Sequence, residues 1–329
     1  MAEILFVKTS SLGDVIHHMP AVTDARLRRR GDRITWVVEE LYVPLVRLHP
    51  GVDDIIPVAA RRWRKTLHRI ETWREIKSFL GRMRARHYDV IVDAQGLVRS
   101  ALVARAAHGS HHGYGRGSVR EALASYFYDV RHQVSRDKHA IERNRELTAL
   151  ALGYTANGDI DYGLHNPTQT APQRRYALLL HGSARPEKEW PEERWVSVGH
   201  ALAEEGIDTL LLWGDAEERA RSERLAKAIG DTASVADRRP LDEVAAFVAN
   251  AAIVIGLDTG LTHLAAAFRV PLVPIFVKSA PRLTGPRGTG PIITLGQDGQ
   301  MPSVDDVVAA YRRLLDDRSG RAPPESKAV

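Results

Sequence analysis

Three loops in this 329-residue sequence carry polar residues whose types and spacing suit phosphate binding and proton transfer. The first, residues 8–14 (KTSSLGD), ends on Asp14, a carboxylate able to act as a general base. The second, residues 181–195 (HGSARPEKEWPEERW), carries Lys188 ahead of a predicted helix, where its ammonium would meet a phosphate. The third loop lies at residues 256–267 (GLDTGLTHLAAA). Together they predict a phosphorylated ligand beside a proton acceptor.

The third loop is the most specific of the three. A predicted strand ends at Asp258, Gly260 permits a tight turn, and the residues that follow have a helical composition. The N–H groups from Thr259 to Thr262, with two hydroxyls and the positive end of the helix, would form a cradle for a pyrophosphate. His263 suits a core or capping role as well as a ligand role.

Each loop also has a purely structural interpretation. Asp14 would serve as a helix cap, and Lys188 as an exposed loop lysine. A dinucleotide site requires G-x-G-x-x-G, of which Gly13 alone is present, and the phosphate loop G-x-x-x-x-G-K-[ST] is absent. Glu39 does occupy the place of a ribose-binding acid. The missing glycines nevertheless argue against an NAD-dependent dehydrogenase.

Alternating strands and helices would position these loops. Short apolar runs predict strands at residues 3–8, 34–38, 55–58, 88–93, 176–180, 209–213, 253–256 and 270–277, and a final helix at 303–315. Such strands between helices indicate parallel sheets covered on both faces. The predicted fold is α/β, with two Rossmann-like doubly wound domains facing a central cleft.

Composition places the boundaries of these domains. Residues 1–160 form the predicted first domain, 161–174 a Gly-, Asn- and Pro-containing linker, 175–317 the second domain, and 318–329 a flexible tail. The chain has no cysteine, no apolar run of the ~20 residues that span a bilayer, and no signal-like start. We therefore expect a cytoplasmic protein. Its histidine pairs and the D-x-D at 159–161 lack the context of metal sites, so no metal and no cofactor are expected.

Residues 61–86 are strongly basic, with ten Lys or Arg against two Glu. Such a block is either a solvated surface or a docking face for a nucleic acid, an anionic lipid, or a phosphorylated or carboxylated sugar. Trp63 and Trp73 within it also suit a membrane interface. Apolar residues recur at helical spacing and predict one buried stripe, formed by Ile70, Trp73, Ile76, Phe79, Leu80 and Met83.

The chain resembles the heptosyltransferase family of GT-B glycosyltransferases, and within it the type I members, from residue 3 to about residue 315. The resemblance is carried by residues 8–17 (KTSSLGDVIH), 36–40 (WVVEE), 61–65 (RRWRK), 93–98 (DAQGLV), 120–127 (REALASYF) and 258–264 (DTGLTHL). One departure is the loop at 277–281 (VKSAP), where the family often has G-P-T-D-P.

The resemblance implies an inverting enzyme of lipopolysaccharide inner-core biosynthesis. Its donor would be ADP-L-glycero-D-manno-heptose and its acceptor the Kdo of Kdo-lipid A, at the cytoplasmic face of the inner membrane as a peripheral protein. No nucleic acid partner is expected. A later-acting heptosyltransferase of type II or III stays open, as does a non-catalytic nucleotide-binding module that docks on membranes.

The resemblance also implies roles for particular residues. The catalytic pair is Asp14, as base, and Lys188, which faces the diphosphate. The donor-binding residues are Thr9, Ser10, Gly13, Ser183, Lys188, Glu217, Asp258, Thr259, Gly260, Leu261, Thr262 and His263, with Glu218 as the alternative to Glu217. The acceptor-binding residues are Arg61, Arg62, Arg64, Lys65 and Arg120.

Overall fold

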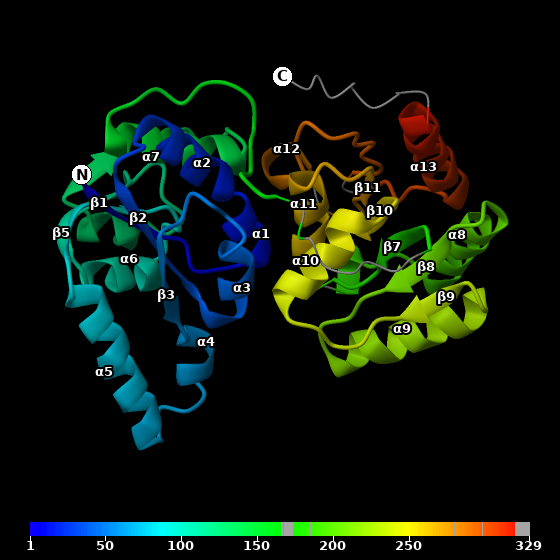
Figure 1. Cartoon of the computed structure of the whole chain (residues 1–329), viewed down its shortest axis with the longest axis horizontal. Helices are drawn as coiled ribbons and strands as arrows, with labels where there is room; N and C mark the ends of the chain where they lie inside the picture. The colour runs from blue at the N-terminus through cyan, green and yellow to red at the C-terminus, as the bar shows by residue number, and fades with distance from the viewer. Residues whose placement is uncertain (166, 168–173, 184–185, 279–280, 298, 320–329) are drawn as a thin grey trace, which may run out of the picture. The chain divides into compact units, whose positions relative to one another are not determined.

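A computed structural model of the chain divides into two compact units (Figure 1). The structure describes residues 1–165, 167, 174–183, 186–278, 281–297 and 299–319. The first unit is Met1–His165 with Arg282–Thr284, and the second holds the other described residues. Among the described residues, none of the helices has both the length and the apolar character needed to cross a bilayer.

The first unit is built on a six-stranded parallel sheet in the order β3-β2-β1-β4-β5-β6. Its strands are β1 (Glu3–Val7), β2 (Arg33–Glu39), β3 (Asp54–Val58), β4 (His87–Asp93), β5 (His108–Tyr114) and β6 (Val130–His132). Its α-helices are α1 (Leu12–Ile16), α2 (Met19–Arg28), α3 (Val43–Val46), α4 (Ala60–Trp63), α5 (Ile70–Arg84), α6 (Val98–Arg105) and α7 (Ala140–Leu152). The central strand β1 is apolar throughout its buried length, because helices cover both of its faces.

The second unit has a five-stranded parallel sheet in the order β11-β10-β7-β8-β9. Its strands are β7 (Tyr176–Leu180), β8 (Asp208–Leu211), β9 (Ala233–Val235), β10 (Ile253–Leu257) and β11 (Leu272–Ile275). Its α-helices are α8 (Glu192–Glu204), α9 (Ala216–Ile229), α10 (Leu241–Asn250), α11 (Gly260–Ala267) and α13 (Val304–Ser319), while the short α12 (Pro281–Thr284) spans the division between the units. Trp195, Leu202 and Tyr311 lie in its core.

In both sheets the order in which the chain adds strands reverses at one point. In the first unit the chain builds β1, β2 and β3 outward and then returns to the other side of β1 to form β4; in the second it does the same with β7 and β10. Connections at such a point leave in opposite directions, so the carboxyl ends of the two strands border a crevice that binds ligands in open α/β sheets. The predicted class, two doubly wound Rossmann-like domains, is confirmed.

Some local predictions were wrong. The strand β5 was missed because its sequence, HGSHHGY, lacks an apolar pattern. The buried stripe on α5 is confirmed at Phe79 and Met83, which pack against the sheet, but Ile70 is 60% and Trp73 54% exposed. The amino-terminal turns of α5 extend past the sheet (Figure 1), and of the described residues of α5 the apolar core beneath the helix includes none before Phe79, although Thr72 is buried.

Candidate active site

The loop after β1 holds a buried lysine beside Asp14. Lys8 Nζ donates a 2.8 Å hydrogen bond to the Ala94 carbonyl oxygen in the loop after β4, so the lysine links the two strands of the reversal point. Helix α1 begins at Leu12, and Ser11 donates its backbone N–H to Asp14 Oδ2 at 3.0 Å. Asp14 therefore caps the helix as expected, and its other oxygen is directed to Lys8.

Two cations hold Asp14 in its ionised form. Lys8 Nζ lies 3.9 Å from Asp14 Oδ1, and Arg120 Nη1 lies 3.5 Å from Oδ2. Burial alone would raise the pKa of Asp14, but Lys8, the hydrogen bonds from Ser11 and Arg120 together outweigh it, and the pKa lies below its ordinary value. At neutral pH the side chain is thus a carboxylate that can accept a proton. It keeps 26% of its side-chain surface accessible.

Asp14 opens into a cavity of about 190 Å³ at the carboxyl ends of β1, β4 and β5. Five cationic side chains line this cavity around the single carboxylate of its lining, namely Lys8, Arg120, Arg136, Lys138 and Arg143. A positive lining favours an anionic ligand.

Asp93, at the end of β4, has a structural role. The side chain is fully buried, and it accepts hydrogen bonds from the Gln95 N–H at 2.9 Å, Ser100 Oγ at 2.8 Å and Tyr128 Oη at 2.7 Å. Burial raises its pKa, and these hydrogen bonds offset the rise in part. Asp93 therefore fixes the loop that brings Gln95 Oε1 to the Ser10 N–H, at 3.3 Å.

In the second unit the loops after β7 and β10 meet through an ion pair. Lys188 Nζ lies 2.6 Å from Asp258 Oδ2, and both side chains are more than four-fifths buried. One of the three ammonium N–H groups binds the carboxylate, which aims the others. Asp258 thus acts on the cation, whereas a phosphate would be bound by Lys188 itself.

Helix α11 begins at Gly260, two residues after Asp258. Thr259 caps it, accepting the Leu261 N–H at 3.3 Å, and Thr262 Oγ1 donates to the Leu257 carbonyl oxygen at 2.6 Å. His263 is buried, with Nε2 3.9 Å from Asp258 Oδ1. The structure therefore brings together Lys188 and all six predicted residues of this turn, and the helix end adds positive potential for an anion.

Two glutamates follow the Trp213–Gly214 turn and differ in position. Asp215 caps α9, accepting the N–H groups of Glu217 and Glu218 at 3.0 Å each. Glu218 Oε2 accepts the Gly214 N–H at 2.6 Å. The other oxygen, Oε1, lies so close to Gly182 that a Cβ added to this glycine would be 2.5 Å from it. Glu217 is exposed. Glu218 thus lies against the loop that follows β7, beside the half-buried Ser183.

The remaining predicted site residues lie in the first unit. Thr9 and Ser10 are buried in the loop after β1, and Gly13 is in the first turn of α1. Arg120 contacts Asp14, whereas Arg61, Arg62, Arg64 and Lys65 are exposed on α4 and the turn after it. Arg62 is bound by two carboxylates, those of Glu40 at 2.9 Å and Glu75 at 2.8 Å.

Sequence reasoning missed Lys8 and the cations contributed by α7 and the segment before it. Arg143 lies within a helix that no motif marks, and Arg136 and Lys138 lie in a polar segment. Lys8 did carry a signal, since a lysine directly follows a strand of buried apolar residues. In the divergent loop 277–281, residues 279 and 280 are outside the described part of the chain.

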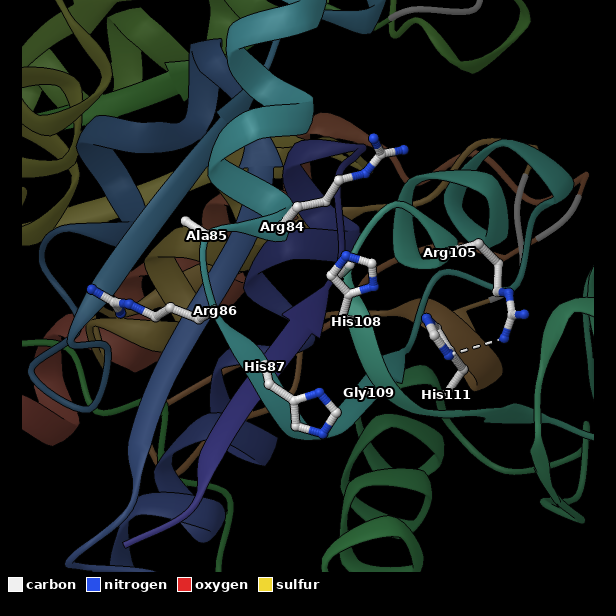
Figure 2. Close-up of a pocket in the computed structure, with 9 residues that line it drawn as sticks. Arg84, Ala85, Arg86, His87, Arg105, His108, Gly109 and His111 are labelled. Carbon is white, nitrogen blue, oxygen red and sulfur yellow. Dashed lines mark hydrogen bonds between the residues drawn. The ribbon is translucent and has the colours of Figure 1, made fainter.

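A larger hollow, of about 720 Å³, lies at the opposite edge of the first sheet (Figure 2). The amino ends of β4 and β5 and the carboxyl end of α5 form it, and it is lined by Arg84, Arg86, His87, Arg105, His108 and His111. Figure 2 shows Arg105 turned to His111, to which it is hydrogen-bonded at 3.1 Å. This hollow is separate from the Asp14 cavity because the two lie at opposite ends of the strands.

Two Rossmann-like units, one with an ionised carboxylate and the other with a lysine beside the start of a helix, have the architecture of a glycosyltransferase of the GT-B fold. Residues 76–310 match the model of glycosyltransferase family 9 (heptosyltransferase). The chain belongs to this family.

One relative and two solved structures match nearly the whole chain. Lipopolysaccharide heptosyltransferase 1 of Escherichia coli O18:K1:H7 is 38% identical over 324 residues, 97% of this chain and 98% of the relative. The solved structure of E. coli heptosyltransferase WaaC with ADP has a TM-score of 0.86 at 37% identity and covers 95% of this chain and 99% of that one. The same protein with ADP-2-deoxy-2-fluoro heptose gives 0.83 at 37% identity, covering 96% and 99%.

Proposed function

We propose that this enzyme transfers L-glycero-D-manno-heptose from ADP-heptose to the Kdo of Kdo-lipid A, in the assembly of the lipopolysaccharide inner core. The observation that carries the proposal is the ionised Asp14, held by Lys8 and Arg120 inside a cationic cavity. An acceptor rich in carboxylate and phosphate suits that cavity. The solved relative with ADP-2-deoxy-2-fluoro heptose supports the donor.

In the proposed reaction Asp14 takes the proton of the attacking acceptor hydroxyl. The oxygen of that hydroxyl forms a bond to the anomeric carbon, while the bond from this carbon to the phosphate oxygen breaks and its electron pair leaves with ADP. Lys188 and the N–H groups at the start of α11 stabilise the charge that develops on the diphosphate. Attack on the face opposite ADP inverts the anomeric centre.

The proposed mechanism also assigns roles to the other site residues. We propose Lys188 and the 258–263 turn for the diphosphate, and Glu218 in preference to Glu217 for the ribose, since Glu218 lies against the loop after β7. Further donor contacts are proposed for Thr9, Ser10, Gly13 and Ser183. Acceptor contacts are proposed for Arg120, Arg61, Arg62, Arg64 and Lys65. Among these, the charge of Arg62 is balanced by Glu40 and Glu75. We further propose that the first domain ends at residue 160 and that the second begins at residue 175. We also propose that the enzyme is cytoplasmic and contacts the inner membrane peripherally.

The direct test supplies purified protein with ADP-heptose and Kdo-lipid A. We expect release of one ADP for each acceptor that gains one heptose, with NMR of the product showing an anomeric configuration opposite to that of the donor. Retention of configuration would contradict the mechanism. Transfer solely to an acceptor that already carries heptose would indicate a later-acting heptosyltransferase, and binding of ADP-heptose with no transfer to either acceptor would indicate a non-catalytic module.

Nucleotide selectivity gives a second expectation. ADP should raise the Tm without added metal, because a ligand that binds the folded state alone stabilises it, by about 2.7 kcal/mol at a hundred times its Kd. UDP and NAD should raise it less at equal concentration. A thermal-shift series with EDTA present checks this, and stabilisation by NAD equal to that by ADP would argue for a dinucleotide enzyme instead.

The cations beside Asp14 predict a pH effect. Lys8 and Arg120 lower the pKa of Asp14, so removing Lys8 as Lys8→Met raises that pKa. The carboxylate is then protonated at a higher pH, and the acid limb of the kcat/KM profile moves to higher pH. Arg120→Gln should move it in the same direction by less, since Arg120 contributes less to the shift. If the acid limb does not move in Lys8→Met, Lys8 does not control the pKa of the group that acts as base.

A further inference from the structure

The amino-terminal end of α5 carries apolar side chains that face solvent. Leu67 is 47% exposed in the turn before the helix, and Ile70 and Trp73 are more than half exposed in its first two turns. Residues three apart lie on the same face of a helix, so Ile70 and Trp73 are neighbours. In Figure 1 this end of α5, with the loop that joins it to α4, projects beyond the sheet of the first unit. We call these three side chains the α5 tip.

Hydrogen bonds hold the tip in shape. Trp73 Nε1 donates to the Leu67 carbonyl oxygen at 2.8 Å, which joins the third member to the other two. Thr72 Oγ1 donates to the Thr66 carbonyl oxygen at 2.8 Å and fixes the base of the turn. The indole N–H is therefore satisfied within the protein. The ring can leave water without losing a hydrogen bond, which removes the main cost of burying a tryptophan.

Cations surround the tip. Arg74 and Lys77 are exposed and lie four and seven residues after Ile70, on the same outward face of α5, and Arg64, Lys65 and Arg69 precede it in the turn. The acidic Glu75 lies on the flank of the helix, where it binds Arg62 and the indole N–H of Trp63. Glu71 is also exposed, in the first turn of α5. The outward face thus combines a compact apolar patch with a surround in which cations outnumber acids.

We infer that the α5 tip inserts into the interfacial region of an anionic phospholipid bilayer, with the surrounding cations on the lipid headgroups. Trp, Leu and Ile beside Lys and Arg are the composition that lies in the membrane interface, where apolar side chains reach about 5–10 Å into the bilayer. Nucleic acid would use the cations and leave the three apolar side chains in water. A protein partner is less favoured because the patch is small and the charge around it is mainly positive, with Glu71 as the exposed acid.

The tip also lies where a membrane-borne substrate is needed. Helix α4, which carries the proposed acceptor residues Arg61 and Arg62, directly precedes the turn that contains Leu67. Both follow the carboxyl end of β3, the sheet edge at which Asp14 lies. This part of the inference rests on the proposed function, since it takes the acceptor to be a lipid; binding of the tip to vesicles does not.

Vesicle flotation tests the inference. The full chain is mixed with vesicles of phosphatidylethanolamine and phosphatidylglycerol, and the bound fraction is compared with that on phosphatidylcholine vesicles. We expect binding to the anionic vesicles, and a loss on the order of tenfold or more in Leu67→Ser/Ile70→Ser and in the triple variant that adds Trp73→Ser. The double variant keeps the Trp73 hydrogen bond, so it remains informative if the triple variant folds poorly. A double variant that floats as well as wild type would overturn the inference.

Matched controls distinguish insertion of the tip from non-specific hydrophobic binding and from non-specific electrostatic attraction. Leu27→Ser/Leu150→Ser removes two leucines of similar exposure, 56% and 46%, from α2 and α7, and should float like wild type. Arg74→Gln beside the tip should weaken binding about fivefold, as for a cation near an anionic surface. Arg84→Gln, on the same helix but in the hollow of Figure 2, should have less than a twofold effect. Equal losses in Arg74→Gln and Arg84→Gln would mean diffuse charge, and would overturn insertion at the tip.

Activity assays distinguish failure of the inference from failure of the proposed function. With an acyl-free, water-soluble Kdo acceptor, the Leu67→Ser/Ile70→Ser variant should keep kcat within about twofold of wild type. With Kdo-lipid A embedded in anionic vesicles it should lose most of its rate. An enzyme inactive on both acceptors would refute the proposed function and leave the flotation result standing. A variant that retains full rate on embedded acceptor, or that loses self-association instead of flotation, would contradict the inference.

Discussion

Asp14→Asn is expected to lower kcat by about 10²–10⁴-fold, the contribution of a general base, with both substrates saturating. An amide cannot take the proton of the acceptor hydroxyl. Its Oδ1 can still accept the Ser11 N–H, as Asp14 Oδ2 does now, so α1 keeps its cap. ADP affinity should change little, because the residues proposed to bind the diphosphate all belong to the second unit.

The stability of this variant needs its own measurement. Asp14 is the countercharge of the buried Lys8, so its neutralisation should lower the free energy of unfolding by about 1–2 kcal/mol, whereas the expected loss of kcat corresponds to about 3–5 kcal/mol. Asp32→Asn is a suitable control, since Asp32 also has a lowered pKa and pairs with Arg29, away from the cavity. Turnover assays and thermal melts on both variants distinguish the loss of kcat from the loss of stability. If Asp14→Asn turns over within a few-fold of wild type, Asp14 is a cap and not the base.

The candidate site of the second unit was easier to predict from the sequence than that of the first unit. The turn at 258–263 is contiguous, and a strand, a glycine turn and a helix are each visible in its composition, so its residues were found together. Lys188 lies 70 positions earlier, but the same strand-to-helix pattern marked it. Local chain geometry determines this half of the site, and local geometry is what sequence patterns report.

The first unit's site depends on contacts between distant segments. Arg143 reaches the cavity from α7, and Arg120 reaches Asp14 across 106 positions of sequence. No periodicity encodes such approaches, so Arg143 was missed, and Arg120 was included because of the family resemblance. The α5 stripe failed for a related reason. Helical spacing predicts which residues share a face, but not where the neighbouring sheet ends, and Ile70 and Trp73 lie beyond that end.

The two units use one topology for different chemistry. In each, loops leave the first and fourth strands of the unit at the reversal point, and a lysine in one loop pairs with an aspartate. The balance of charge differs. Asp14 has two cations near it and is the proposed proton acceptor, whereas Asp258 is bound at 2.6 Å to Lys188, which is the group proposed to face the ligand. In the proposed mechanism the lysine–aspartate pair therefore acts through its carboxylate in one unit and through its ammonium in the other.

Lys188→Met is expected to lower kcat/KM by about 10²–10³-fold, comparable to the loss of one preorganised group that stabilises developing charge. The methionine fills the same space without the ammonium, so the leaving diphosphate loses its main cation and ADP binds more weakly. Asp258→Asn should have a smaller effect, because it loosens the aim of Lys188 and keeps the charge.

Lys227→Met, on the exposed face of α9, is the matched control and should change neither rate nor ADP affinity. Steady-state kinetics and titration calorimetry with ADP measure the three variants side by side. Losses in the order Lys188→Met, then Asp258→Asn, then Lys227→Met would support the assignment of the cation to the leaving group. An Asp258→Asn loss larger than that of Lys188→Met would mean that Asp258 contacts the donor directly, and Lys188 would then be its structural partner.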